Sequence, residues 1–464
     1  MTNTLPARSA SRPSAHSRDS AVGQHHFKRS VIDIGMGLLT PLLGQEFLDR
    51  HHLRDPLNKA LKFGVKQGFS AAGASTRQFK KIQRAGKAPA RLAPSSAGYF
   101  DLTPDDDQQM IVETVSDFAE EILRPAARAA DQAATYPPLL MAKAAELGIT
   151  AIKVPESFDG IAESRTTVTQ ALVAEALAYG DMGLALPILA PGGVASALTH
   201  WGSADQQATY LKEFSGDNVP QACVAIVEPH PLFDPTSLRT TAVRTPSGYR
   251  LDGVKSLVPA AADAELFIVA AQLNGKPTLF IVEASAPGLS VKADPSMGIR
   301  SAALGQVELN KVSVPTTARL GEDDADFARD YSEAIALSRL GWAALAVGTS
   351  HAVLDYVIPY VKEREAFGEP IARRQAVAFM CANIAIELDG LRLLTWRGAA
   401  RADQGLPFAR EAALAKRLGT EKSMQIGLDG VQLLGGHGYT KEHPVERWYR
   451  DLRALGVAEG VVVL

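Results

Sequence analysis

The chain has 464 residues and a mass of 49.4 kDa, with 46% apolar, 21% charged and 6% aromatic residues, which suits a globular protein of two or three domains. Its net charge of −3 excludes binding to nucleic acid that is driven by the overall charge of the protein. Its two cysteines, Cys223 and Cys381, stand far apart in the sequence, which excludes a disulfide framework and a cysteine zinc site, so no metal is expected.

The first hundred residues differ in charge from the rest of the chain. Residues 1–95 contain 16 lysines and arginines and five acids, whereas the remainder contains 32 basic and 46 acidic residues. Residues 1–30 are too polar to form a core, which predicts a disordered basic tail. Residues 31–100 mix apolar residues with lysines, which predicts a basic amphipathic helical extension. This extension docks on the acidic body, or it contacts a membrane surface or a larger enzyme assembly, and both alternatives stay open.

The sequence also bears on where the protein works. The longest apolar run, Val31 to Leu43, contains Asp33 and falls short of the roughly 20 residues that a membrane-spanning helix needs. The separate cysteines favour a reducing compartment. We therefore expect a cytoplasmic protein of bacterial type, peripheral to a membrane if the basic arm binds one. The arginine- and serine-rich start also resembles a transit peptide, so mitochondrial import is a further alternative.

Residues 101–221 are predicted to form a helical domain. Thr103 to Asp106 supply a capping hydroxyl, a first-turn proline and acids at the positive end of a helix. Further helical patterns cover residues 139–147, 167–179 and 193–211.

The periodicity then changes, and residues 222–322 are predicted to form a small β domain. Short β-branched runs bounded by glycine, proline and asparagine predict strands at residues 224–227, 240–243, 266–270, 279–282 and 307–314.

Long helical patterns return in residues 323–464. They cover residues 326–362, 372–402 and 408–434, and antiparallel helices of this length form a bundle. The predicted fold is therefore mostly α with a small inserted β domain.

A cluster of small and polar residues follows the last long helix. It runs from Gln432 through Gly435, Gly436, His437 and Gly438 to Tyr439, and Glu442, Pro444, Arg447, Arg450 and Asp451 come after it. Paired glycines let a backbone approach a ligand closely, and the exposed N–H groups can bind an anion such as a pyrophosphate. The alternative is a glycine turn that closes the helix.

This stretch resembles the signature of the acyl-CoA dehydrogenase family, Q-x-x-G-G-x-G-Y-x-x-E-x-P-x-x-R-x-x-R-D. A second family block spans Arg364 to Ile371 and is followed by Gln375, and residues 102–125 and 287–300 also agree. The resemblance extends from about residue 100 to the end. It implies an α-helical N-terminal domain, a middle β domain and a C-terminal four-helix bundle.

The resemblance implies FAD as cofactor. In the family, an arginine, a phenylalanine, glutamines and paired glycines hold the adenosine-diphosphate half of an FAD bound mainly to a neighbouring subunit, and they match Arg364, Phe367, Gln375, Gln432, Gly435 and Gly436. A guanidinium suits a diphosphate. A shared site implies a homo- or hetero-oligomer, either a dimer or a tetramer.

The resemblance also implies the reaction. Glu459 matches the family base in R-D-x₇-E-G. The resemblance implies that Glu459 removes the α-proton of an acyl-CoA thioester while the β-hydride passes to flavin N5. It also implies that the Glu459 N–H and a flavin hydroxyl polarise the thioester carbonyl. Arg339 and Gly460 are the implied substrate-binding residues. The product is a trans-2-enoyl-CoA, and an electron-transferring flavoprotein reoxidises the FAD. Ser338 stands where some relatives carry their base, so that position lacks a carboxylate.

The sequence departs from the family where the flavin ring binds. Family residues with a hydroxyl or an indole are replaced by Val227, Leu257, Pro259 and Val461, and the final helical segment of relatives is missing after Leu464. The alternative function is therefore a non-catalytic or half-catalytic subunit of a hetero-oligomer, which lends its adenine-side contacts to a partner. Other flavin chemistry, by an oxidase or monooxygenase, is a third alternative.

Overall fold

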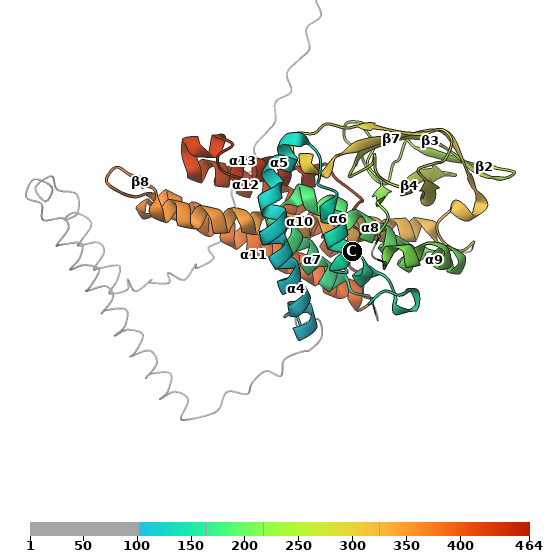
Figure 1. Cartoon of the computed structure of the whole chain (residues 1–464), viewed down its shortest axis with the longest axis horizontal. Coiled ribbons are helices and arrows are strands. Elements are labelled where there is room, and N and C mark those ends of the chain that lie inside the picture. Colours follow the sequence, from blue (N-terminus) through green and yellow to red (C-terminus); the bar gives the residue numbers. More distant parts are fainter. Residues whose placement is uncertain (1–101, 163–164, 217, 324) are drawn as a thin grey trace, which may run out of the picture. The chain divides into compact units, whose positions relative to one another are not determined.

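The computed structural model describes residues 102–162, 165–216, 218–323 and 325–464 (Figure 1). These residues belong to one unit, Phe100–Leu464. The predicted basic tail and helical extension, residues 1–30 and 31–100, lie outside the described residues and stay predictions.

The N-terminal region is helical, as predicted, with helices α4 Asp106–Phe118, α5 Arg124–Ala133, α6 Leu139–Glu146, α7 Thr167–Gly180, α8 Met182–Trp201 and α9 Ala204–Tyr210. A π-helical turn, Ala119–Leu123, joins α4 to α5. The predicted capping residue Thr103 is wrong. Asp105 caps α4 instead, because its carboxylate accepts the Gln108 N–H while the Gln108 side chain accepts the Asp105 N–H.

Helix α8 begins eleven residues before the predicted start at Gly193, and the predicted helix to Leu211 is two helices. The prediction failed because Pro187 and Pro191 suggest a break, yet both lie inside α8. Almost every side chain of α8 is buried, so tertiary packing outweighs the propensity. Among the described residues, only α8 is long and apolar enough to cross a membrane, and 94% of its most apolar window is buried inside the protein.

The middle region is a seven-stranded sheet within the described residues. Its strands are β1 Ala222–Ala225, β2 Thr241–Thr245, β3 Gly248–Val258, β4 Leu266–Leu273, β5 Lys276–Glu283, β6 Leu289–Ala293 and β7 Gly305–Pro315. They follow the order β1-β4-β2-β3-β7-β6, and β5 also pairs with β4. Asn274 and Gly275 join β4 to β5 with positive φ, the two-residue turn that suits an antiparallel hairpin.

The local sequence patterns did not predict β3 and β6. Strand β3 contains Asp252, Gly253 and Lys255 and a register shift against β7, so its alternation of apolar residues is interrupted. Strand β6 is mostly exposed and lies at the sheet edge, where little apolar patterning is needed.

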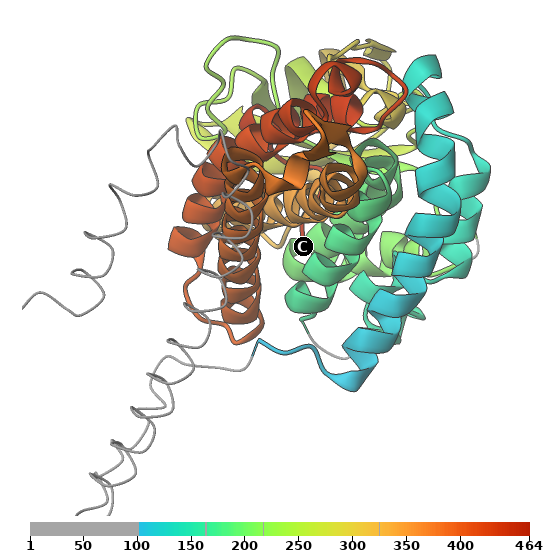
Figure 2. The ribbon, with the colours of Figure 1, turned by 90° about the vertical axis from the view of Figure 1, so that its left-hand side faces the viewer.

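The C-terminal region contains α10 Phe327–Glu363, α11 Gln375–Asp403, α12 Ala409–Leu434 and α13 Val445–Leu452. Helix α10 packs against α7, α11 and α12. Figure 2 shows α4 and α5 on one side of the unit and the orange-red helices α11 and α12 on the other, with α7 and α8 between them. The predicted order of a helical N-terminal region, a middle β region and a helical C-terminal region is thus confirmed.

Candidate active site

The carboxylate of Glu459 lies between two basic side chains and is 8% exposed. Arg339 of α10 donates from Nε and Nη2 to Oε1 at 3.1 Å each, and Nε lies 3.3 Å from Oε2. Lys416 of α12 places its Nζ 3.7 Å from Oε1. The structure therefore brings Glu459 and Arg339 together, and it adds Lys416, which sequence reasoning missed.

The backbone next to Glu459 is held by the bundle and the sheet. The Gly460 carbonyl accepts from Ser338 Oγ at 2.9 Å and from Trp342 Nε1 at 3.0 Å, both on α10. The Val461 N–H donates to Val224 O of β1 at 3.1 Å. Gly460 has φ +75, and a Cβ there would lie 2.6 Å from Ile226, so only glycine fits. Gly460 therefore carries the turn that seats Glu459.

The residues after this turn run into the core. Val462, Val463 and Leu464 are at most 1% exposed. Lys153, at the end of a short turn after α6, donates from Nζ to Val463 O at 2.9 Å. Val461 has φ +65, a strained conformation for a β-branched residue, and turns the segment inward.

The two ring-side segments that the family resemblance singled out lie side by side. Ser256 N–H donates to Val227 O at 2.8 Å. Lys255 Nζ lies 2.9 Å from Glu228 Oε1, with both side chains buried. Burial opposes ionisation of Glu228, but Lys255 and the N–H groups of Thr240 and Arg239 outweigh it and lower its pKa to about 2. These charged residues therefore hold the β domain together, and the ring-side positions Val227 and Leu257 supply no side-chain hydrogen bond.

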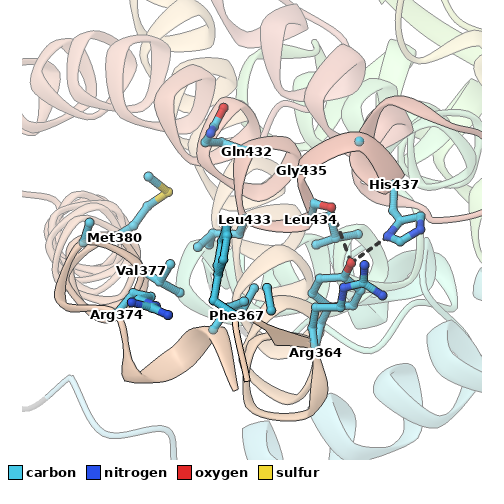
Figure 3. Close-up of a pocket in the computed structure, with 15 residues that line it drawn as sticks. Arg364, Phe367, Arg374, Val377, Met380, Gln432, Leu433, Leu434, Gly435 and His437 are labelled. Carbon is cyan, nitrogen blue, oxygen red and sulfur yellow. Dashed lines mark hydrogen bonds between the residues drawn. The ribbon is translucent and has the colours of Figure 1, made fainter. Parts of the chain in front are cut away.

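A cavity of about 980 Å³ lies where the end of α10, the start of α11 and the turn after α12 meet (Figure 3). Arg364, Phe367, Gln432, Gly435 and Gly436, all predicted site residues, line it. Apolar walls come from Ile371, Val377, Met380, Leu433 and Leu434. The structure thus gathers five of the six predicted cofactor-binding residues around one hollow.

Two polar side chains at this cavity, those of Arg364 and Gln432, have no partner within the described part of the chain. The Arg364 guanidinium and the Gln432 amide make no hydrogen bond or ion pair there, and both residues are exposed. A Cβ on Gly435 or Gly436 would meet no atom within 4 Å. An unpaired cation, an unpaired amide and open backbone beside apolar walls fit a diphosphate joined to a flat ring system, as in the adenosine-diphosphate half of FAD.

The hairpin of β8 Glu365–Ala366 and β9 Glu369–Pro370 carries Phe367 at its tip. Phe367 has φ +55, is 95% exposed, and lies under the Arg374 guanidinium, 5.6 Å from its ring centre. Gln375 is the exposed first residue of α11 and does not line the cavity. Arg374, which sequence reasoning missed, lines it instead.

The signature arginines hold domains together. Arg450 forms two hydrogen bonds of 2.9 Å with the Asp131 carboxylate of α5. Arg447 Nε donates to Asp181 Oδ2 at 3.0 Å, and Asp181 also caps α8. Asp451 accepts the Ile299 N–H at 2.5 Å. These groups are occupied internally, so the anion site predicted at the paired glycines does not include them.

Comparisons with known proteins match the chain in three ranges. Family profiles described as acyl-CoA dehydrogenase N-terminal, middle and C-terminal domains match residues 105–216, 223–312 and 329–461. A probable acyl-CoA dehydrogenase of Bacillus subtilis is 32% identical over 78% of this chain and 96% of its own length. The mitochondrial short-chain specific acyl-CoA dehydrogenase of Bos taurus is 32% identical over 76% and 86%.

Solved structures agree. Butyryl-CoA dehydrogenase from Megasphaera elsdenii superposes with a TM-score of 0.71 at 28% identity, over 78% of this chain and 97% of that one. PigA with FAD and proline superposes with a TM-score of 0.71 at 26% identity, over 77% and 95%. A chain described as the electron transferring flavoprotein of Acidaminococcus fermentans gives a TM-score of 0.72 at 28% identity, over 78% and 96%.

Proposed function

The chain belongs to the acyl-CoA dehydrogenase family, and on that premise we propose that it removes an α-proton and a β-hydride from an acyl-CoA thioester to give a trans-2-enoyl-CoA. FAD is the cofactor of this family and, when bound, supplies the acceptor for the β-hydride. Glu459 is the proposed base. The observation that carries this proposal is a buried carboxylate seated where α10, α12 and β1 meet.

Arg339 has a proposed part in presenting this base. Its guanidinium holds both carboxylate oxygens of Glu459, and it is 28% exposed. The carboxylate must therefore exchange the Arg339 contact for the α-carbon of the substrate. Substrate entry is then coupled to breaking of the contact between Arg339 and Glu459, because the Glu459 carboxylate cannot contact Arg339 and the α-carbon at once.

We further propose an oligomer with an electron-transferring flavoprotein as its redox partner. The cavity at Arg364 and Gln432 takes the adenosine-diphosphate half of an FAD held mainly by a second copy. Helix α11 exposes Phe379, Ile386 and Leu393 at seven-residue intervals, and each is 55–67% exposed. An apolar stripe of this kind suits helix packing between subunits.

A visible spectrum of the purified chain and a Glu459→Gln variant test this function. We expect a stoichiometric flavin band that bleaches when the preferred acyl-CoA of a chain-length panel is added. Glu459→Gln should keep the band and slow bleaching by about 10²–10⁴-fold, since a general base contributes that much. Exposed Glu442, changed to Gln, is the matched control and should bleach like the wild type. Undiminished bleaching by Glu459→Gln would overturn the assignment of the base.

The ring-side replacements favour a second candidate, a subunit that lends its adenine-side contacts to a partner. Val227, Leu257 and Pro259 offer no side-chain hydrogen bond to a flavin ring, whereas Arg364 and Gln432 stand unpaired in the described structure. A colourless protein that turns yellow only when mixed with an intact relative would favour this candidate over the enzyme.

A further inference from the structure

Lys416 contacts both the base and the backbone that precedes it. Its Nζ donates to the Ala458 carbonyl and lies 3.7 Å from Glu459 Oε1. Its side chain is 15% exposed, and Glu459 is its one carboxylate partner within the described residues. Burial lowers the pKa of Lys416, against the opposing effect of the Glu459 carboxylate. Burying a lysine costs free energy unless its ammonium is paired and hydrogen-bonded, and here both of its contacts are at the proposed base.

The other side of the same peptide unit carries an unused donor. The Ala458 N–H donates to Ala454 O at 2.9 Å and the Val461 N–H to Val224 O at 3.1 Å. The two N–H groups between them, of Glu459 and Gly460, have no acceptor among the described residues. Both residues are buried. Because N–H groups in the interior are nearly always bonded, two successive unbonded ones at a glycine turn point to a bound oxygen atom.

A planar peptide links these two observations. Because the Ala458–Glu459 unit is planar, a bond that fixes the direction of its C=O also fixes the direction of its N–H on the opposite edge. A positive charge at the carbonyl oxygen polarises the unit and strengthens its N–H as a donor. Lys416 can therefore act on a ligand at the N–H without touching it.

We propose that Lys416 is a positioning residue that orients and polarises the Ala458–Glu459 peptide, so that the Glu459 N–H binds the thioester carbonyl oxygen of the substrate as negative charge develops there. This inference rests on the proposed function, in which Glu459 takes the α-proton. The proton passes from the α-carbon to the Glu459 carboxylate, and the electron pair of the broken C–H bond moves toward the carbonyl oxygen that the N–H binds.

The test uses the flavin-loaded full chain and 3-thiabutanoyl- and 3-thiaoctanoyl-CoA, in which sulfur replaces Cβ and blocks loss of hydride. The infrared stretch of a ¹³C-labelled thioester carbonyl reports its polarisation. Exchange of α-protons in D₂O, followed by mass spectrometry, reports proton removal without any turnover. The variants are Lys416→Met and Lys416→Arg, with Lys422→Met as the matched control, because Lys422 lies on the same helix and pairs with Glu387 instead.

Lys416→Met should return the carbonyl band toward its position in free ligand and slow α-proton exchange by about 10-fold, less than the loss of an oxyanion donor itself. Lys416→Arg should retain most of both effects, and Lys422→Met should match the wild type. If Lys416→Met does not fold, both measurements are made on Lys416→Gln, which keeps a donor without the charge.

The outcomes separate the two proposals. A wild-type carbonyl band and wild-type exchange in Lys416→Met would overturn the role of Lys416 and leave the dehydrogenase proposal standing. If the wild-type chain binds neither probe and exchanges no α-proton, both proposals are wrong. A variant that only loses thermal stability, with an unmoved band, assigns Lys416 a structural role.

Discussion

At the scale of single residues, Lys153 carries a buried charge that has no carboxylate partner within the described residues. It is 5% exposed, and its Nζ donates to the Val463 carbonyl at 2.9 Å. Burial lowers the pKa of Lys153 to about 7, from an ordinary value of 10.5. The folded chain therefore releases this proton near neutrality, whereas the unfolded chain keeps it until pH 10.5.

This difference predicts a pH-dependent effect of Lys153→Met. Between about pH 7 and 10.5 the unfolded state of the wild type binds more protons than the folded state, so its free energy of unfolding rises with pH. The variant lacks that rise. Its stability relative to the wild type should therefore be highest at pH 6 and fall by on the order of 1 kcal/mol per pH unit above pH 7. Urea unfolding at pH 6, 8 and 9 measures this.

Exposed Lys441, changed to Met, is the control and should show a difference from the wild type that does not vary with pH. A Lys153→Met curve parallel to the wild type over the same range would contradict the proposed titration.

At the scale of elements, glycines in two long helices make room for the segment that follows the base. A Cβ on Gly193 of α8 would lie 2.1 Å from Val461 O, and one on Gly341 of α10 would lie 2.3 Å from Val462 O. Both contacts are with backbone, which cannot move aside as a flexible side chain does. The position of Glu459 therefore depends on glycines more than a hundred residues away.

Gly341→Ala should destabilise the protein by about 1–3 kcal/mol, because the clash with the Val462 carbonyl exceeds the gain in helix propensity. Gly390→Ala in α11 is the matched control. No atom lies within 4 Å of its Cβ, so it should stabilise by roughly 0.5–1 kcal/mol. Denaturant unfolding of both variants measures the contrast, and equal effects would refute the role given to Gly341.

At the scale of the whole molecule, α13 joins three parts of the chain. Arg450 binds Asp131 of α5, and Arg447 binds Asp181 at the start of α8. Asp451 receives the Ile299 N–H and Arg450 donates to Met297 O, both in the segment between β6 and β7. The signature stretch therefore secures the packing of the helical and β regions around the site.

Arg450→Met should lower the free energy of unfolding by about 3 kcal/mol, because it removes both short hydrogen bonds to the Asp131 carboxylate, which is 5% exposed, and leaves only Arg300 Nε at 3.7 Å. Arg453→Met, one turn away and exposed, should change it by less than about 0.5 kcal/mol. Tryptophan fluorescence during denaturant unfolding follows both. A loss for Arg450→Met no larger than for Arg453→Met would exclude this role.

Local sequence patterns determined much of the fold. The predicted helices 326–362, 372–402 and 408–434 lie within three residues of α10, α11 and α12, because helices of this length repeat their pattern many times. The prediction failed at α8 because two prolines suggest a break that tertiary packing overrides. It failed at β3 because charged residues and a register shift interrupt the alternation of apolar residues.

The sequence by itself determined which residues are candidates: Glu459 and Arg339, and the group around Arg364 and Gln432, stand in patterns that can be read along one chain. Only the tertiary structure decided which groups meet. Lys416 reads as a solvated charge on a helix, yet the packing of α12 against α10 places it beside the base. The sequence shows Arg447 and Arg450 in the signature stretch without showing their partners, which are carboxylates from α5 and from the start of α8. The physical reason is that a pairing between charges depends on distances across the fold, which spacing along the chain does not contain.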